Sequence, residues 1–188
     1  PAVIQRNILE NPGWYTAYTP YQAEIAQGRL EALFNFQTMI CDLTKMDLAN
    51  ASLLDEGTAA SEAMIMLFNN RNKQKKINNY NYFFVDKNIL PQSLSVLKTR
   101  ANPLGIKLLV EDPNKIDFKI KFFAGIFQYP GKNGKIQNLN PIIKKFREKR
   151  ITTVVASDLL SLAIITPPGE MEVDVVVGSS QRFGIPMG

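Results

Sequence analysis

Aromatic side chains with polar groups gather in one irregular segment, Asn11 to Gly28, which reads NPGWYTAYTPYQAEIAQG. Their spacing matches neither a helical stripe nor strand alternation. Rings that combine packing area with hydrogen-bonding groups, placed just ahead of a helix, are typical of a shaped surface or the wall of a site. A well-packed lead-in that anchors the following helix is the alternative. The aromatic side chains are Trp14, Tyr15, Tyr18 and Tyr21, and the hydroxyl of Thr19 lies among them in the sequence.

Two other segments could bind an anion. The first, Asp55–Glu62 (DEGTAASE), opens a helix with small residues that allow close approach of the backbone to a strand or a ligand. Its acidic start favours ordinary capping over a phosphate cradle. The second, Gly178–Gly188, follows a predicted strand, and ligands of parallel α/β sheets bind beyond the carboxyl ends of the strands. Arg182 in this loop could pair with a carboxylate or phosphate, or it could tie loops or a subunit interface together.

The composition removes several kinds of catalytic site. The 188 residues include no histidine and one cysteine, which excludes Ser–His and Cys–His pairs and histidine-based zinc sites. Cys41 lies in an apolar helical run, where we expect a buried structural thiol, and we expect no metal site. There is no glycine-rich dinucleotide motif, P-loop or CxxC pair. Chemistry must therefore come from carboxylates, lysines, tyrosines or a bound cofactor.

The chain is basic, with a net charge of +5 and a pI of about 9.3. Its cations concentrate in Arg71–Lys76 and Lys144–Arg150, next to predicted helix ends, where they favour the helix dipole and stay solvated. Neither run is interleaved with stacking aromatics, so we do not expect nucleic-acid binding. No apolar run is long enough to span a bilayer and no targeting segment is visible, so we expect a cytoplasmic, bacterial-like protein.

Hydrophobic periodicity predicts an α/β fold. A helix is expected from Pro20, capped by Thr19, to about Leu43, and another over Gly57–Phe68. Short β-rich runs then alternate with helices, which indicates right-handed crossovers and a mostly parallel sheet with helices on both faces. The predicted strands are Tyr82–Val85, Ile106–Val110, Lys121–Tyr129, Thr152–Ala156 and Asp174–Val177, and the helices between them are Pro91–Asn102 and Leu139–Arg150.

We expect one partial domain over residues 1–188. Residues 1–80 form a helical lead-in that carries the aromatic segment and two main helices, and residues 81–188 form the βαβ repeats of the sheet. The basic, Asn-rich piece Asn69–Asn81 is expected to be a surface loop. Because the chain closes directly after a strand and a glycine-rich loop, we expect it to be truncated at both ends.

Long motifs resemble one family. The run from Asn11 to Glu56, followed by DEGTAASEAM, VVASDLLSL and PPGEMEVDVVVGSSQRFGIPMG, is similar to the P-protein of the glycine cleavage system, a glycine dehydrogenase (decarboxylating). The resemblance covers the whole chain and is looser over Asn69–Ile136. It implies a fold-type-I pyridoxal-phosphate transferase architecture, like the large domain of aspartate aminotransferase. It also implies that the chain is a fragment from the amino-terminal half of a longer enzyme.

The resemblance implies an activity and partners for the longer protein. Family members decarboxylate glycine with pyridoxal phosphate, held by a lysine, and pass the aminomethyl group to the lipoyl arm of the H-protein. The implied partners are the H-protein and the carboxy-terminal half or a second subunit, in an oligomer.

The motif that should hold the cofactor lysine departs from the family pattern. Counting back from Ile185-Pro186 places Gln181 where the Schiff-base lysine is expected, and glutamine cannot form an imine. The strand that should carry an aspartate for the pyridinium nitrogen holds valines, with Asp158 displaced further along. Lys87, Lys98 and Lys107 match no cofactor-lysine motif.

We therefore expect a half that lacks the cofactor lysine, binds no pyridoxal phosphate and is inactive when isolated. Its role would be to support the active site and the interface, with Arg182 and the aromatic side chains walling the substrate cleft or that interface. The alternative is a non-enzymatic α/β module for structure and partner binding. The side chains meant are the aromatic Trp14, Tyr15, Tyr18 and Tyr21, together with Thr19.

Overall fold

The computed structural model describes residues 2–10, 22, 24, 27–50 and 52–184. The predicted site residues Trp14, Tyr15, Tyr18, Thr19 and Tyr21 lie outside the described residues, as does the Ile185-Pro186 step.

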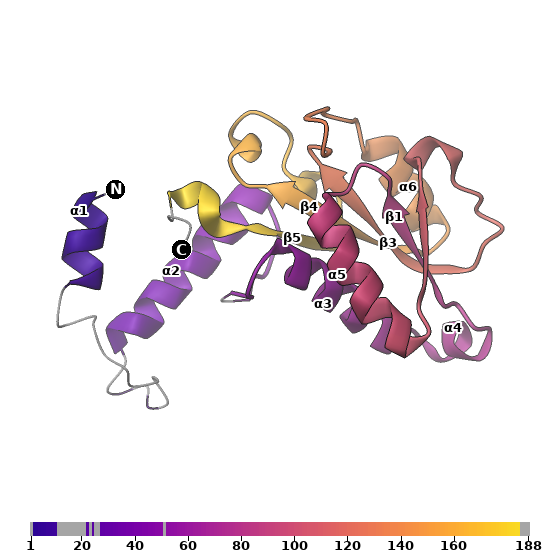
Figure 1. Ribbon diagram of the computed structural model, residues 1–188, viewed down its shortest axis with the longest axis horizontal. Helices are drawn as coiled ribbons and strands as arrows, with labels where there is room; N and C mark the ends of the chain where they lie inside the picture. Colours follow the sequence, from indigo (N-terminus) through magenta and orange to yellow (C-terminus); the bar gives the residue numbers. More distant parts are fainter. Residues whose placement is uncertain (1, 11–21, 23, 25–26, 51, 185–188) are drawn as a thin grey trace.

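Five parallel strands form one sheet in the order β2-β1-β3-β4-β5 (Figure 1). Every neighbouring pair is parallel, so all the strands end at the same edge of the sheet. The predicted parallel α/β architecture is therefore confirmed. The strands are β1 (Tyr82–Asp86), β2 (Lys107–Glu111), β3 (Phe122–Tyr129), β4 (Thr152–Asp158) and β5 (Val175–Ser179).

The helices are α1 (Ala2–Ile4, continued by a π-helical turn over Gln5–Leu9), α2 (Gln27–Thr44), α3 (Glu56–Asn69), α4 (Lys73–Ile77), α5 (Pro91–Ala101) and α6 (Asn140–Glu148). Both faces of the sheet are covered, one by α3 and α5 and the other by α6. Figure 1 shows α1 apart from the sheet and α2 extending away from it. No helix of the described residues is long and apolar enough to cross a membrane.

Two sequence-based expectations about helices are wrong. Gln22 and Glu24 are not helical, so the helix does not run on from Pro20 as predicted; α2 begins at Gln27. A local capping signal does not form a helix unless the first turns are also stabilised by packing. The expected surface loop Asn69–Asn81 contains α4, which begins where the Asn72 side chain accepts a hydrogen bond from the Lys75 amide at 2.8 Å.

The core has two layers because strand side chains alternate between the faces of the sheet. On one face, α3 and α5 cover Phe83, Val85 and Val154. On the other face, α6 packs its Phe146 against Phe84 and Phe127, and the end of α2 adds half-buried Ile40 and Leu43. The first layer thus fixes α3 against the sheet, and both layers fix the strands.

The small residues at the start of α3 serve helix packing. A Cβ on Gly57 would lie 3.2 Å from Val96 Cγ2 and 3.5 Å from the Cα of Ser93, both on α5. At Gly57 the close neighbour is thus another helix, while α3 as a whole also contacts β3, β4 and β5, in agreement with the expected approach to a strand. This contact brings the N-terminus of α3 to the carboxyl edge of the sheet.

Candidate functional site

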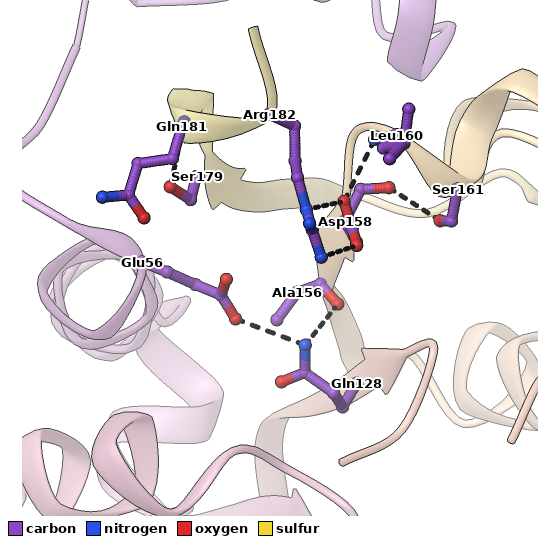
Figure 2. A network of polar contacts seen from close by, with 9 residues as sticks. All are labelled: Glu56, Gln128, Ala156, Asp158, Leu160, Ser161, Ser179, Gln181 and Arg182. Carbon is purple, nitrogen blue, oxygen red and sulfur yellow. Dashed lines mark hydrogen bonds and ion pairs between the residues drawn. The ribbon is translucent and has the colours of Figure 1, made fainter. Parts of the chain in front are cut away.

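Polar side chains end several of the strands at the carboxyl edge of the sheet. Asp86 ends β1, Gln128 lies next to the end of β3, Asp158 ends β4 and Ser179 ends β5. The two last strands extend two residues beyond their predicted ends, so Asp158 and Ser179 belong to the sheet. Figure 2 shows that Glu56, from the first turn of α3, faces this group.

Gln128 connects three elements of this edge. Its side chain is buried, and Nε2 donates to Glu56 Oε1 and to the carbonyl oxygen of Ala156, both at 3.2 Å (Figure 2). The backbone amide of Leu90 donates to Gln128 Oε1 at 3.4 Å. The amide side chain therefore joins α3, β4 and the loop after β1 through hydrogen bonds that use both of its ends.

Glu56 carries a carboxyl group that is harder to ionise than usual. Burial raises its pKa most, and the negative charges of Asp158 and Asp55 raise the pKa further, while the hydrogen bond from Gln128 opposes the rise. A negative charge at this position is thus disfavoured by its own surroundings. An additional anion would meet the same repulsion.

Asp55 occupies the N-terminus of α3. The Thr58 amide donates to Asp55 Oδ1 at 2.6 Å, which is the N-cap hydrogen bond, and hydrogen bonding from Thr58 lowers the pKa of Asp55. The sequence prediction that this segment caps its own helix is confirmed. The helix therefore turns a carboxylate, rather than a free set of amide groups, towards the site.

Arg182 lies in the 3₁₀ turn Ser180–Phe183 that follows β5 and forms a two-point ion pair with Asp158 (Figure 2). Its Nε donates to Oδ1 at 3.1 Å and its Nη2 to Oδ2 at 2.9 Å. Asp158 Oδ1 also accepts from the Leu160 amide at 3.0 Å. This pair agrees with the second of the two sequence-based interpretations, in which Arg182 ties loops together, because it joins the turn after β5 to the end of β4.

Gln181 lies next to Arg182 in the same turn, and the two side chains point in different directions (Figure 2). The side chain of Gln181 is exposed, and its backbone amide donates to Ser179 Oγ at 3.2 Å. The turn thus presents an uncharged amide and a paired guanidinium, with no amine.

A cavity of about 440 Å³ lies beside this turn, between α2, the start of α3 and the ends of β4 and β5. Its apolar wall includes Phe36 and Ile40 of α2, and its polar wall includes Ser157 and Gln181. The Ser157 hydroxyl is buried and has no hydrogen-bond partner among the described residues.

The lysines singled out from the sequence lie away from the cavity. Lys87 follows β1, and its Nζ pairs with Asp112 Oδ2 at 2.7 Å; the hydrogen bond from Lys87 is the main cause that lowers the pKa of Asp112 to about 2. Lys98 lies in the last turn of α5, and Lys107 opens β2 at the opposite edge. None of the three is among the described residues that line the cavity.

Sequence reasoning missed Gln128 and Glu56. One signal could have identified Gln128, because it is the polar residue in the otherwise apolar strand FFAGIFQY and lies near the end where ligands bind. Glu56 was considered only for its charge, and its contact with Gln128 joins positions 72 residues apart. Cys41, expected to be buried, is half-buried on α2. Among the described residues, no group of histidine, cysteine, aspartate or glutamate could hold a metal ion.

Solved structures share this arrangement of sheet and helices. A putative O-acetylhomoserine (thiol)-lyase from Campylobacter jejuni matches 89% of the chain with a TM-score of 0.64 at 13% identity, over 44% of its own length. Cystathionine gamma synthase from Xanthomonas oryzae matches 78% of the chain with a TM-score of 0.59 at 14% identity, over 36% of its length. The chain thus has the α/β fold of the fold-type-I pyridoxal-phosphate enzymes.

A nearer match is a glycine decarboxylase (P-protein) of the glycine cleavage system, crystallised in inhibitor-bound form. It covers the whole chain with a TM-score of 0.85 at 30% identity, and 42% of its own length is covered. The profile of the glycine cleavage system P-protein family matches residues 1–188. The chain belongs to this family.

Bacterial relatives agree in sequence over the full chain. It is 60% identical to the glycine dehydrogenase (decarboxylating) of Flavobacterium johnsoniae and 58% identical to that of Christiangramia forsetii, in each case over all 188 residues. The chain spans 20% of the length of each of these relatives.

Proposed function

We propose that the chain is a segment of a glycine dehydrogenase (decarboxylating) and belongs to a half of that enzyme that holds no cofactor of its own. The observation that carries the second part is the occupation of the carboxyl edge by the chain's own side chains. Arg182 pairs with Asp158, and Asp55 caps α3 where an anion would otherwise bind. The first part, that the chain is a segment of a glycine dehydrogenase, is supported by the relatives that are 60% and 58% identical to it.

Pyridoxal phosphate does not fit the residues present at this edge. Its phosphate would meet the carboxylates of Asp55 and Glu56 at the start of α3. In our proposal Gln181 takes the place of the Schiff-base lysine and supplies no amine. Asp158, the carboxylate at the end of β4, is already paired with Arg182. No catalytic step is therefore assigned to this edge.

In the whole protein, we propose that pyridoxal phosphate is held by another part of the chain or a partner subunit and supplies the electron sink for glycine decarboxylation. The aminomethyl product would pass to the lipoyl H-protein. The carboxyl edge of the present segment would stay occupied by its own side chains, and other surfaces of the segment would contact the catalytic half. A cytoplasmic location stays a prediction.

The supporting role is favoured by an apolar surface on α2 and the loop after it. Phe34 is 67% exposed, Leu54 is 87% exposed, and Leu33, Met39 and Leu48 are also exposed. An apolar surface of this extent is typical of a contact with another protein surface. We propose that it faces the carboxy-terminal half or a second subunit.

The aromatic segment precedes α2 in the sequence, and we propose that it continues this surface to wall the substrate cleft or the interface. Arg182 would border the same region through the turn after β5. The side chains proposed for the wall are Trp14, Tyr15, Tyr18, Thr19 and Tyr21.

Cofactor trapping in the whole protein tests the proposal. The protein is incubated with pyridoxal phosphate, reduced with borohydride, digested and mapped by mass spectrometry. We expect one stoichiometric pyridoxyl-lysine outside residues 1–188 and none within them. A Gln181→Lys variant should remain unmodified at position 181, because Asp55 and Glu56 still repel the phosphate.

Two outcomes would contradict it. A stoichiometric adduct on a lysine of this segment would show that the half binds the cofactor. Failure of the whole protein to release carbon dioxide from glycine in the presence of H-protein would favour the alternative, a non-enzymatic α/β module.

A further inference from the structure

Cations line the amino edge of the sheet, opposite the candidate functional site. Lys107 opens β2, Lys121 directly precedes β3, and Arg150 precedes β4 by two residues. Because the strands are parallel, these three positions share one edge. From β2 to β4 there are three strand spacings, which places the cations along a row of about 14 Å.

Helix α4 adds to the same edge. Lys75 fixes the helix there, because its Nζ donates to the carbonyl oxygen of Arg150 at 2.7 Å and to that of Phe123 at 3.4 Å. Lys121 Nζ reaches the carbonyl oxygen of Asn78, the C-cap of α4, at 3.5 Å. Figure 1 shows α4 at the end of the molecule away from α2.

An apolar side chain lies among these cations. Ile77, the last residue of α4, is 68% exposed, and the same helix carries exposed Lys73 and Lys76. An apolar centre with a charged rim is the usual composition of a protein–protein contact. Solvation of helix ends, which the sequence favoured for this run, explains the lysines but does not explain the exposed isoleucine.

Lys107, Lys121 and Arg150 form no ion pair among the described residues, whereas Lys75 interacts electrostatically with Asp174. The ion pairs of the described residues are formed by other basic residues: Lys87, Arg100, Arg147 and Arg182. Asp174, which precedes β5 at the same edge, instead accepts hydrogen bonds from the amide and hydroxyl of Thr153, both at 2.8 Å. The positive charges of Lys107, Lys121 and Arg150 are thus not neutralised by an ion pair within the described residues.

Two tyrosine rings at this edge are covered by lysines. Lys107 Nζ lies 5.4 Å from the ring centre of Tyr82, and Lys121 Nζ lies 6.0 Å from that of Tyr80. Rings covered by ammonium groups are not open for the base stacking that single-stranded nucleic acid requires. The surface therefore suits carboxylates better than nucleic acid.

We propose that the amino edge of the sheet docks a protein partner through an acidic surface that surrounds an apolar side chain. The docking surface consists of Lys73, Lys76, Ile77, Lys107, Lys121 and Arg150. A partner bound here would not cover the carboxyl edge, which lies on the opposite side of the sheet. The inference does not depend on the proposed function.

Peptide binding to the whole protein tests this surface. Two fluorescein-labelled probes are used: a peptide of about twenty glutamates, and one of the same length with leucine at every fourth position. The variant Lys76→Glu/Lys107→Glu/Lys121→Glu should weaken binding of both probes about tenfold at low salt. A matched variant, Lys98→Glu/Lys115→Glu/Lys135→Glu, makes the same charge change at exposed positions outside the docking surface. It should weaken binding of the two probes less than about threefold.

The apolar centre has its own variant. Ile77→Ser should weaken the leucine-containing probe and leave the glutamate probe unchanged. Equal losses in the two triple variants would overturn the proposal, because binding would then follow net charge alone. Tighter binding of a twenty-base-pair DNA duplex than of either peptide would assign the surface to nucleic acid instead. If the triple variant fails to fold, Lys76→Glu alone keeps the test, since the Lys76 side chain is exposed.

Discussion

At the scale of single residues, the carboxyl edge contains more acid than base. Asp55, Glu56 and Asp158 face one arginine, Arg182, and the resulting repulsion is part of what raises the pKa of Glu56. A site built to hold a phosphate would have the opposite balance. The other carboxylates of the edge are thus held by internal pairs, whereas the Glu56 carboxylate is disfavoured first by burial and then by the neighbouring negative charges, both of which raise its pKa.

The raised pKa of Glu56 predicts that the stability of the fold depends on pH. Because the folded-state pKa of Glu56 is raised above the ordinary value of 4.5, the unfolded state loses its proton first as pH rises, and folding stability falls between these two values. Glu56→Gln removes this fall and keeps an acceptor for Gln128. We expect the variant to match the parent near pH 4 and to exceed its free energy of unfolding by on the order of 1 kcal/mol at pH 7.

Urea unfolding of both proteins across pH 4 to 8 measures the difference. Glu31→Gln, at an exposed position on α2, changes the net charge equally and is the control. A gain at pH 7 that is the same for both variants would mean that overall charge, and not the position of Glu56, is responsible.

The sequence predicted the residues whose role is local. Asp55 as a cap follows from neighbouring residues and is observed. The sequence left open whether Arg182 binds a ligand or ties loops together, because its partner Asp158 lies 24 residues away. The contact between Gln128 and Glu56 could not be predicted, because it depends on the packing of α3 against α5 and the sheet. The roles of the aromatic side chains that precede α2 stay predictions.

At the scale of elements, the apolar strands were predictable and their ends were not. Each predicted strand is observed within two residues, since uninterrupted apolar runs bounded by turns are typical of buried parallel strands. Asp158 and Ser179 continue β4 and β5 because ladder pairing with the neighbouring strand extends past the apolar residues. Helix α4 was missed because its five polar-rich residues carry no apolar stripe.

Packing between β3 and α6 depends on a glycine. A Cβ on Gly125 would lie 2.7 Å from Cε1 of Phe146 and 2.9 Å from Cβ of Phe84, both closer than side chains tolerate. Gly125→Ala should lower the free energy of unfolding by about 1–3 kcal/mol, because both phenylalanines are fully buried and cannot yield without cost.

A second glycine supplies the control for this prediction. Gly28 in α2 has open space around its Cα, so Gly28→Ala should raise stability by about 0.5 kcal/mol through helix propensity. Urea midpoints measured in parallel check both values. A loss of similar size in both variants would show that the tight packing at Gly125 is not the cause.

At the scale of the whole molecule, the two edges of the sheet differ in charge and in occupation. The carboxyl edge is closed by its own ion pair and N-cap, whereas Lys107, Lys121 and Arg150 at the amino edge form no ion pair among the described residues. Helix α2 adds a third surface, which is apolar. Three surfaces of different character could contact neighbours on several sides, which agrees with the supporting role that we propose for the chain.

The apolar surface of α2 gives the prediction at this scale. Phe34 is 67% exposed in the described chain, so a polar residue there should cost no more than about 0.5 kcal/mol if the surface faces water. If the surface is buried against the rest of the enzyme, the lost burial of a phenylalanine costs about 1.5–3 kcal/mol. In the whole protein we expect Phe34→Glu to show the larger loss of stability, the one that follows from lost burial. It should be seen as faster amide hydrogen exchange across Gln27–Thr44. Asn35→Glu places the same charge on the next exposed position and should leave the exchange unchanged, because no apolar burial is lost. Unchanged exchange in Phe34→Glu as well would mean that α2 faces solvent in the whole enzyme, and the interface would then have to lie elsewhere on this half.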